Sequence, residues 1–442
     1  MRSASVGRSY PGGMSTTIAG PAPLTADEVL ALRGDFPLLQ REGLVYLDST
    51  ATSQRPRQVL DAEVAYVQHE HAAVHRGAHT LASEATERFE DARTAVAGFV
   101  GADEDELVWT SGATGALNLL ATAIGNASSG RGGAAAERLR LREGDELVVT
   151  EQEHHANLIP WQELALRTGA TLRWIPVDDE GALRLEEAAR VIGPRTRLVA
   201  FTHVSNVLGA VNPVADVVAI ARAQGALVVI DACQSVPHLP FDMRALDVDF
   251  AAFSGHKMLG PTGIGALVGR RELLNALPPA SFGGSAITTV TMDRAEFLPA
   301  PQRFEPGTQA TAQAVGLAAA ARYLQGIGME RVAAHEAAIG ARLADGLDAI
   351  DGVRLLGPRP GTPRVGLASF VVDGVHAHDV GQFLDDRGIA VRVGHHCAQP
   401  LHRRLGVTAS TRASGYAYTT ESEVDAFLAA AADAVRFFGV GA

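Results

Sequence analysis

The chain has 442 residues, long enough for two domains, and its 47% hydrophobic and 20% charged residues are typical of a globular protein. A formal net charge of −12 without a basic stripe argues against a nucleic-acid partner. No apolar run has the roughly 18 residues that a membrane span needs, so no membrane segment is expected.

The N-terminus carries arginines but no apolar signal core, so residues 1–44 are interpreted as a leader and arm. The start of this leader is expected to be disordered, with Met14 as an alternative first residue. The two cysteines of the whole chain, Cys233 and Cys397, could form at most one bridge, which predicts a reduced, cytoplasmic protein.

Short β-branched runs alternate with helical patterns from residue 45 to about 270. Five of these runs are expected to be strands: 106–110, 145–150, 196–202, 226–232 and 247–254. Strands that alternate with helices predict βαβ units and a mostly parallel sheet covered on both faces. Residues 45–310 are therefore expected to form one large α/β domain.

The pattern changes after residue 310. Two Ala-rich amphipathic segments, 312–326 and 329–350, predict long helices, and strand-like runs follow at 364–372 and 389–393. Residues 311–442 are therefore expected to form a smaller α+β domain. In the large domain, the Gly-, Ala- and Arg-rich stretch 125–145 predicts a surface loop with a charged helical piece.

Polar residues follow the predicted strands, where ligands bind in open α/β sheets. These residues are Thr114, His154, Asn206, Asp231, Gln234, Ser254, His256 and Lys257. One polar residue in such a loop would mean little, but five successive strand ends with polar residues indicate a ligand site.

Lys257 is the only lysine of the sequence, and every other basic residue with a permanent charge is arginine. An amine can lose its proton and attack a carbonyl, whereas a guanidinium in a protein cannot, so a lone lysine indicates amine chemistry. A leftover surface residue is the alternative.

The residues near Lys257 match the needs of pyridoxal phosphate, an aldehyde cofactor. Asp231 is a carboxylate for the ring nitrogen, His154 a flat ring for stacking, and the SGATG turn (111–115) opens a helix that can bind the phosphate. Each has a simpler interpretation, because strand-terminal Asp residues often cap loops and Gly-rich stretches are usually plain turns.

Five segments closely resemble the SufS group of cysteine desulfurases, which are class V, fold-type I pyridoxal-phosphate enzymes. They are EQEHHANLIPWQELA (151–165), THVSNVLGA (202–210), VVIDACQSVPH (228–238), FSGHKMLGPTGIGAL (253–267) and RVGHHCAQPL (392–401). The resemblance runs from about residue 47 to the C-terminus. It implies a seven-stranded, mostly parallel sheet, a smaller C-terminal domain and a homodimer.

The resemblance also implies a role for each matching residue. Lys257 would bind the cofactor and move the substrate α-proton, while His154 stacks on the ring, Asp231 pairs with the ring nitrogen and Gln234 binds the ring hydroxyl. The implied phosphate ligands are Thr114, Ser254, His256 and, across the dimer interface, Thr308. The implied substrate-binding residues are Asn206 and Arg412 for the carboxylate, with Arg392 and His75 also lining the pocket.

Cys397 would be the nucleophile. The resemblance implies that its thiolate attacks the sulfur of L-cysteine, which leaves a persulfide on Cys397 and releases L-alanine. His395 and His396 are neighbours that could lower its pKa or act as a base. Without the resemblance, a small buried hydrophobe is an equally good interpretation of Cys397. Cys233 follows strand residues directly and is expected to pack in the core.

The sequence departs from the SufS pattern near the expected site, at Thr50, Ala113, Gly115, Gln309, Gly415 and Thr419. These changes leave turnover and substrate preference open. Selenocysteine lyase, another pyridoxal-phosphate C–S lyase or aminotransferase, and a catalytically weakened paralogue remain alternatives. The histidine-rich stretches 69–75 and 395–402 lack the spacing of zinc folds, so no metal site is expected.

The implied partner is a sulfur acceptor of the SufU or SufE type, in iron–sulfur cluster assembly or another thiolation pathway. His378 matches a position where zinc-carrying SufU-type acceptors are thought to exchange a ligand. A histidine that is merely solvated is the alternative.

Overall fold

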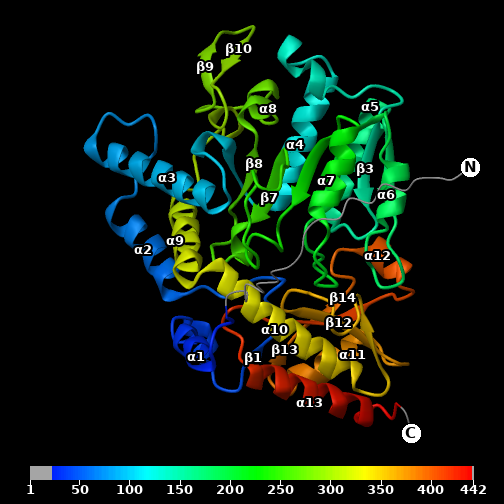
Figure 1. The fold of residues 1–442 in the computed structure, drawn as a ribbon. Helices are drawn as coiled ribbons and strands as arrows, with labels where there is room; N and C mark the ends of the chain where they lie inside the picture. The colour runs from blue at the N-terminus through cyan, green and yellow to red at the C-terminus, as the bar shows by residue number, and fades with distance from the viewer. Residues whose placement is uncertain (1–21, 441–442) are drawn as a thin grey trace, which may run out of the picture.

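Seven strands form the main sheet of the computed structural model, which describes residues 22–440 (Figure 1). The order along the sheet is β2-β8-β7-β6-β5-β3-β4, and only β8 runs antiparallel to its neighbours. The bounds are β2 Leu107–Thr110, β3 Glu146–Thr150, β4 Thr171–Ile175, β5 Thr196–Thr202, β6 Leu227–Asp231, β7 Phe250–Ser254 and β8 Gly265–Gly269. The predicted mostly parallel seven-stranded sheet is confirmed.

Both faces of the central strands of this sheet are buried, which explains why these strands are mostly apolar. In β6, Val228 and Ile230 join one hydrophobic cluster while Val229 joins the other. Helices α2 (Arg57–His69), α3 (Thr80–Phe99), α6 (Leu185–Val191), α7 (Val214–Ala223) and α9 (Thr311–Ile327) contribute to the first cluster. Helices α4 (Ala113–Ser128), α5 (Ile159–Thr168) and α8 (Arg271–Ala276) contribute to the second.

Two strands of the sheet, β4 and β8, were not among the five located in the sequence. Strand β4 is at the edge of the sheet and pairs only with β3. Because an edge strand is partly exposed, as Trp174 is at 57%, its sequence lacks the apolar run of a central strand. Strand β8 begins and ends with glycine, which is unfavourable in strands. Gly265 is nevertheless required, because a Cβ there would lie 2.3 Å from the Phe253 carbonyl oxygen.

A second, four-stranded antiparallel sheet lies below the first in Figure 1. Its order is β11 (Val353–Leu356), β12 (Leu367–Val372), β15 (Ser410–Ser414) and β14 (Arg392–Gly394). Helices α10 (Met329–Asp348), α11 (Ala377–Asp385) and α13 (Glu421–Phe437) pack on it around a third hydrophobic cluster. Helix α12 (Gln399–Arg404) connects β14 to β15.

The N-terminal arm contacts the elements around the second sheet, and its Phe36 and Leu39 also reach the first hydrophobic cluster. Helix α1 (Ala26–Arg33) is tied to α13 by the ion pair between Arg33 and Glu423 at 2.8 Å. Strand β1 (Val45–Tyr46) pairs in parallel with β13 (Ile389–Ala390). The predicted disordered start and Met14 lie outside the described residues.

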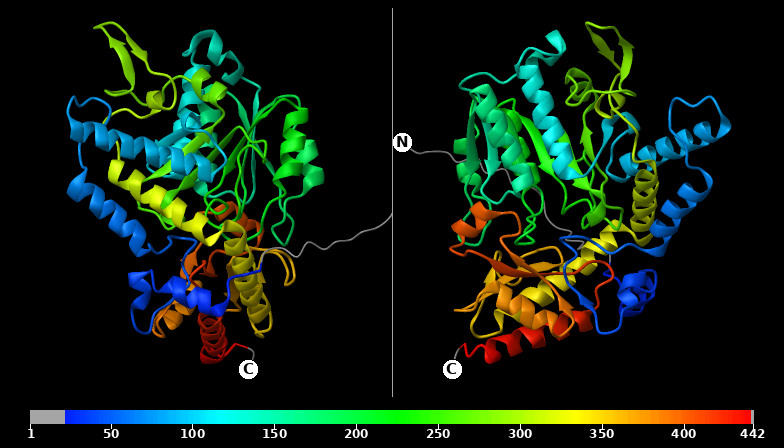
Figure 2. Two further views of the ribbon diagram at one scale, coloured as in Figure 1. Left: turned by 60° about the vertical axis from the view of Figure 1, so that its left-hand side comes forward. Right: turned by 180° about the vertical axis from the view of Figure 1, so that it is seen from behind.

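Helix α9 packs along α2 and α3, while α10 continues from it across to the second sheet, as both views in Figure 2 show. The apolar side chains of α9 therefore belong to the core of the large sheet, although the sequence division at residue 310 assigned them to the small domain. We keep the division into arm, large domain and small domain as a proposal.

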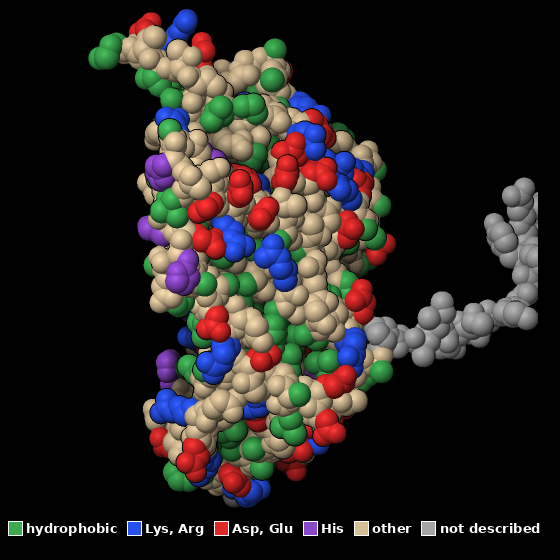
Figure 3. Space-filling view, turned by 90° about the vertical axis from the view of Figure 1, so that its left-hand side faces the viewer, with side chains coloured by type: hydrophobic (Ala, Val, Ile, Leu, Met, Phe, Trp, Pro, Cys, Tyr) green, Lys and Arg blue, Asp and Glu red, His purple; other side chains and the backbone are tan. Residues whose placement is uncertain are grey.

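The surface in Figure 3 carries acidic and basic side chains intermixed, with no continuous basic stripe on that face. A β-hairpin, β9 (Ile287–Val290) and β10 (Ala295–Phe297), extends from the large domain. Among residues 22–440, no helix combines the length and the apolar character needed to cross a bilayer.

Candidate active site

A cavity of about 300 Å³ lies beyond the carboxyl ends of the parallel strands. Thr202, Asp231 and Ser254, the last residues of β5, β6 and β7, line it. It brings together eleven of the residues singled out from the sequence: Thr114, His154, Asn206, Asp231, Gln234, Ser254, His256, Lys257, Arg392, Cys397 and Arg412.

Lys257 ends a short 3₁₀ turn, Gly255–Lys257, directly after β7, and it shares the cavity wall with Asp231 and His154. Burial, and secondly the charge of Lys257, lowers the pKa of His154 to about 4, so the imidazole is neutral near pH 7. Its Nδ1 accepts the Ala156 N–H at 3.0 Å. Asp231 is 4% exposed and accepts the Cys233 N–H at 3.0 Å.

The N-terminus of α4 forms another part of the wall. Gly112 precedes the helix with φ 135°, a conformation that favours glycine. The Ala113 N–H donates to Ser254 Oγ at 2.9 Å, which joins the helix N-terminus to the end of β7. Thr114 lies in the first turn of this 16-residue helix, where N–H groups and the helix dipole favour an anion.

Pyridoxal phosphate fits the chemistry of these groups. The cavity offers one amine, one buried carboxylate, a neutral aromatic ring and a helix N-terminus flanked by hydroxyl and imidazole donors. Lys257, Asp231, His154 and Thr114 would hold its aldehyde, ring nitrogen, ring face and phosphate respectively.

Another part of the cavity wall is suited to a carboxylate. Arg412 is 3% exposed, and its NH1 donates to the Asn206 carbonyl oxygen at 2.8 Å while its Nε has no partner. Asn206 in turn donates to the His396 carbonyl oxygen at 2.8 Å. Arg392 is more exposed and is paired with Asp48 at 2.7 Å.

Cys397 is exposed on a loop between β14 and α12, and its φ of 56° lies in the left-handed region. His396, just before it, has a φ of 48°, so two successive non-glycine residues adopt a conformation that costs free energy. The loop is fixed at its base, because the His155 N–H donates to the Cys397 carbonyl oxygen at 2.7 Å. Strain of this kind is common at functional sites.

Cys233 contrasts with Cys397. It packs against the second hydrophobic cluster, and its Sγ lies 3.7 Å from Ser254 Oγ. Burial, and secondly the charge of Asp231, raises the pKa of the Cys233 thiol to about 12, so this thiol stays protonated near pH 7. The geometry therefore leaves Cys397 as the available nucleophile.

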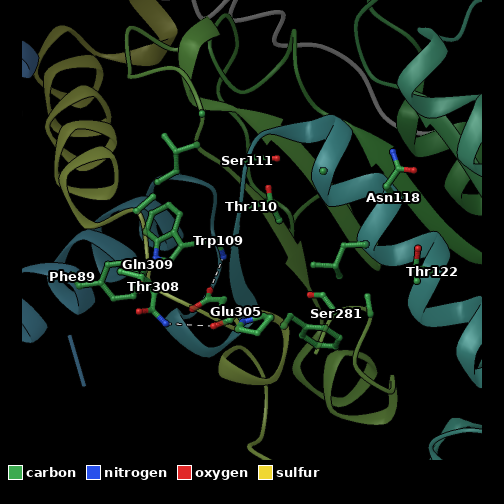
Figure 4. A pocket seen from close by; sticks show the side chains of 18 residues that line it. Phe89, Trp109, Thr110, Ser111, Asn118, Thr122, Ser281, Glu305, Thr308 and Gln309 are labelled. Carbon is green, nitrogen blue, oxygen red and sulfur yellow. Dashed lines mark hydrogen bonds between the residues drawn. The ribbon is translucent and has the colours of Figure 1, made fainter. Parts of the chain in front are cut away.

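Thr308 lies in a different cavity, of about 600 Å³, which borders the start of α4 (Figure 4). Ser111 and Asn118 line this second cavity together with Phe89 and Trp109. The loop of Thr308 is held by Glu305, which accepts the Trp109 N–H at 2.7 Å. Within one chain, Thr308 therefore does not line the cavity that contains Lys257.

Within one chain, His75 does not line the Lys257 cavity either, and its predicted place in a substrate pocket stays a prediction. It is exposed in the loop between α2 and α3, which projects from the side of the large domain in Figure 1. Its Nε2 lies 2.8 Å from Glu90 Oε1, and its ring packs edge-on against Phe89. These contacts hold the imidazole on the surface of α3.

Three of the departures from the SufS pattern have local explanations. A Cβ at Gly115 would lie 2.6 Å from Ser111 Oγ, so the helix packs closely there. A Cβ at Gly415 would lie 3.0 Å from both Ile339 and Thr419. The Thr419 hydroxyl accepts the Tyr416 N–H at 2.9 Å and stabilises this tight turn.

Some buried residues around the cavity carried no signal in the sequence. Glu153 accepts the Thr202 N–H at 3.1 Å and the Asn157 amide at 2.7 Å, and burial raises its pKa to about 8. His238 lies 2.8 Å from Glu336, 98 residues later in the chain. Such pairs come from distant segments, so only adjacency to a recognised motif could have suggested them.

Comparison with known proteins agrees with this geometry. The aminotransferase class-V family matches residues 45–427. The chain is 56% identical to a probable cysteine desulfurase 2 of Mycobacterium leprae, over 94% of this chain and 99% of that protein.

Two solved structures extend the comparison. An apo cysteine desulfurase from Thermococcus onnurineus is 39% identical with a TM-score of 0.87, covering 94% of this chain and 100% of the other. A mutant of C-DES with glycine covalently linked to the PLP cofactor is 27% identical with a TM-score of 0.75, covering 91% and 99%. The chain belongs to the class V aminotransferase family, as a pyridoxal-phosphate-dependent cysteine desulfurase.

Proposed function

We propose that this desulfurase takes sulfur from L-cysteine as a persulfide on Cys397 and delivers it to an acceptor protein of the SufU or SufE type. The observation that carries the proposal is the position of Cys397, exposed on a strained loop at the wall of the cavity that contains Lys257 and Asp231. An exposed thiol can meet both a substrate in the cavity and a second protein outside it.

When bound, pyridoxal phosphate supplies an aldehyde that an amine captures as a carbon–nitrogen double bond, and a ring that accepts electrons from the substrate carbon. Lys257 Nζ would hold this group and afterwards take the proton from the substrate Cα. Gln234 would donate to the ring hydroxyl, and Ser254 and His256 would contribute to the phosphate site. Neutral His154 would provide a flat, uncharged surface for the ring.

Arg412 and Asn206 orient the substrate carboxylate, since the Arg412 Nε is buried without another acceptor. The Cys397 thiolate then attacks the substrate sulfur. A sulfur–sulfur bond forms, and the Cβ–sulfur bond breaks with its electron pair remaining on Cβ. Protonation of Cβ and return of the proton from Lys257 Nζ to Cα complete alanine, and Cys397 retains the persulfide.

The test is a comparison of wild type with Cys397→Ala and, as a matched control, Cys233→Ala. Each protein is loaded with pyridoxal phosphate and mixed with L-cysteine, and alanine and protein-bound persulfide are measured. All three should show the cofactor absorption at about 420 nm, but only Cys397→Ala should lose rapid alanine formation and the persulfide. Wild-type alanine formation by Cys397→Ala would contradict the proposal.

The same proteins separate the alternative functions. A selenocysteine lyase would release selenium from L-selenocysteine at a similar rate with and without Cys397. An aminotransferase would not use Cys397 at all. A weakened paralogue would show the cofactor absorption and release no alanine from either substrate.

We also infer that the protein acts as a homodimer, in which Thr308 of one copy completes the phosphate site of the other. Thr308 lies at the second cavity, separated from the Lys257 cavity by the α4 N-terminus, which borders both. Sedimentation should give twice the chain mass. Thr308→Val should weaken cofactor binding several-fold, and a monomer with unchanged cofactor affinity would contradict the inference.

His378 is our candidate contact for a zinc-carrying SufU-type acceptor. It is exposed near the N-terminus of α11, and its ring stacks on that of His376 with centroids 5.3 Å apart. His378→Ala should lower acceptor-stimulated turnover without changing the unstimulated rate, whereas Gln382→Ala on the same helix should change neither. Unchanged stimulation in His378→Ala would remove His378 from the proposal.

The two unpaired cysteines agree with a cytoplasmic location, which remains part of the proposal.

A further inference from the structure

A row of buried polar side chains leads from α10 to the wall of the Lys257 cavity. Glu336 Oε1 lies 2.8 Å from His238 Nδ1, and His238 Nε2 lies 3.2 Å from Gln234 Oε1. Gln234 Nε2 donates to the Thr50 carbonyl oxygen at 3.0 Å. Each of the three side chains is at most 2% exposed, so water does not compete for these hydrogen bonds.

The pattern of donors and acceptors fixes the orientation of the Gln234 amide. The Thr50 carbonyl can only accept, so the NH₂ end of the amide must face it and the oxygen end must face His238. His238 Nε2 must then carry a proton to donate to Gln234. The facing Nδ1 and Glu336 oxygen share one further proton between them, whichever atom holds it.

The imidazole of His238 is held in place by a second set of contacts. Tyr416 packs edge-on against the ring, with centroids 4.8 Å apart, and the Tyr416 hydroxyl donates to the Pro237 carbonyl oxygen at 2.8 Å. The ring therefore cannot turn to withdraw its Nε2 from Gln234 without displacing a buried tyrosine.

We propose that His238 and Glu336 are positioning residues, which hold the Gln234 amide so that the cofactor hydroxyl meets an N–H donor rather than a carbonyl oxygen. Gln234 lines the cavity, and its Nε2 has a second hydrogen besides the one that Thr50 accepts. Without His238 Nε2, the amide could rotate by half a turn and present its oxygen to the cavity. This inference rests on the role of Gln234 in the proposed function.

The alternative is that the buried Glu336–His238 pair only anchors α10 to the large domain. The two interpretations differ in what the cofactor experiences. An N–H donor stabilises the deprotonated ring hydroxyl, so its loss should raise the pH at which the enzyme-bound carbon–nitrogen double bond loses its proton. If the pair is purely structural, its removal would lower the free energy of unfolding and leave that pH unchanged.

The experiment titrates the visible absorption of the loaded full-length protein against pH, without substrate, for wild type and three variants. His238→Phe and Glu336→Leu should move the midpoint upward by about one pH unit, the worth of a hydrogen bond to a charged group. Glu336→Gln can still donate to a His238 that keeps its Nε2 proton, so this conservative variant should titrate like wild type. Asp231, His154 and the other ionisable groups of the cavity are unchanged in every protein.

A second background makes the test independent of folding defects. In Gln234→Ala, the midpoint should already be raised, and adding Glu336→Leu should move it no further. The proposal is overturned if His238→Phe and Glu336→Leu titrate like wild type while still folded. It is also overturned if Glu336→Leu causes the same shift with and without Gln234. Failure of the proposed function would look different, because the wild type would then titrate normally and form no persulfide.

Discussion

The backbone N–H of His155 donates a hydrogen bond to the carbonyl oxygen of Cys397, 2.7 Å away. The contact is reinforced by the Gln399 N–H, which donates to His155 Nε2 at 3.2 Å. A segment that follows β3 of the large sheet thus fixes the C-terminal side of the loop that carries Cys397. Burial, and secondly His395, lowers the pKa of His155, which keeps its imidazole neutral and able to accept.

His155→Ala should therefore slow persulfide formation. The substitution removes the acceptor of the Gln399 N–H and leaves the backbone hydrogen bond to Cys397 intact. Loss of one hydrogen bond costs about 0.5–1.5 kcal/mol, so we expect a single-turnover rate up to about tenfold lower. Exposed His69→Gln is the control. An unchanged rate in His155→Ala would show that the loop is positioned without this side chain.

The two cysteines should react with iodoacetamide at very different rates. Cys397 is exposed, whereas Cys233 is packed against apolar residues and its pKa is raised to about 12. Near neutral pH the thiolate is the reactive form, so labelling should begin at Cys397 and reach Cys233 only when the protein unfolds. Peptide mass spectrometry would measure both sites. Comparable labelling of Cys233 in the folded protein would contradict this assignment.

Arg93 and Glu305 form a buried two-point ion pair that connects α3 to the loop carrying Thr308. Arg93 NH1 and NH2 lie 2.7 and 2.9 Å from the two Glu305 oxygens, and Arg93 is 1% exposed. Arg93→Leu leaves a buried carboxylate without its partner, which should lower the free energy of unfolding by about 3–5 kcal/mol.

Denaturant unfolding would measure this loss. The exposed pair between Arg342 and Asp425 is the matched control, and Arg342→Ala should cost at most about 1 kcal/mol. Removing both Arg93 and Glu305 should cost less than the sum of the single changes. Additive losses, or a loss no larger than in the control, would count against the ion pair as a main link.

His203 should make the protein less stable in mild acid. Burial lowers its folded-state pKa from 6.5 to about 4, and its Nδ1 has no hydrogen-bond partner. Below about pH 6.5 the unfolded chain binds a proton that the folded protein rejects, so the free energy of unfolding falls as the pH decreases toward about 4.

His203→Leu removes this proton uptake and places an apolar side chain of similar size beside Phe241. Between about pH 6.5 and pH 5, its free energy of unfolding should fall by about 2 kcal/mol less than that of wild type. Urea unfolding at the two pH values would measure the difference. Parallel losses in both proteins would mean that His203 is protonated equally in the folded and unfolded states.

The pattern of apolar residues was sufficient to predict those strands and helices whose burial is uniform along their length. Strands β3, β5, β6 and β7 are covered on both faces and read as apolar runs, and α9 and α10 repeat their apolar residues at helical spacing. Strands β4 and β8 were missed, since one has an exposed edge and the other begins and ends with glycine.

The placement of Thr308 and His75 shows the limit for the site itself. The strand-end residues were expected to meet because the carboxyl ends of parallel strands share one edge of a sheet, and Lys257, Asp231 and His154 do line one cavity. Thr308 and His75 belong to loops without such a constraint, and only the packing of those loops decides which cavity or surface they reach.

By itself, the sequence determined the α/β class and the strand ends that carry polar groups. Hydrophobic periodicity and the succession of strands and helices along the chain are local properties of the sequence. It also singled out Lys257, since only one amine side chain is present. Only the tertiary structure decided that Glu336 lies beside His238 and that His155 holds the Cys397 loop. Those contacts join segments far apart in the chain, and they depend on how whole elements pack rather than on any neighbouring residue.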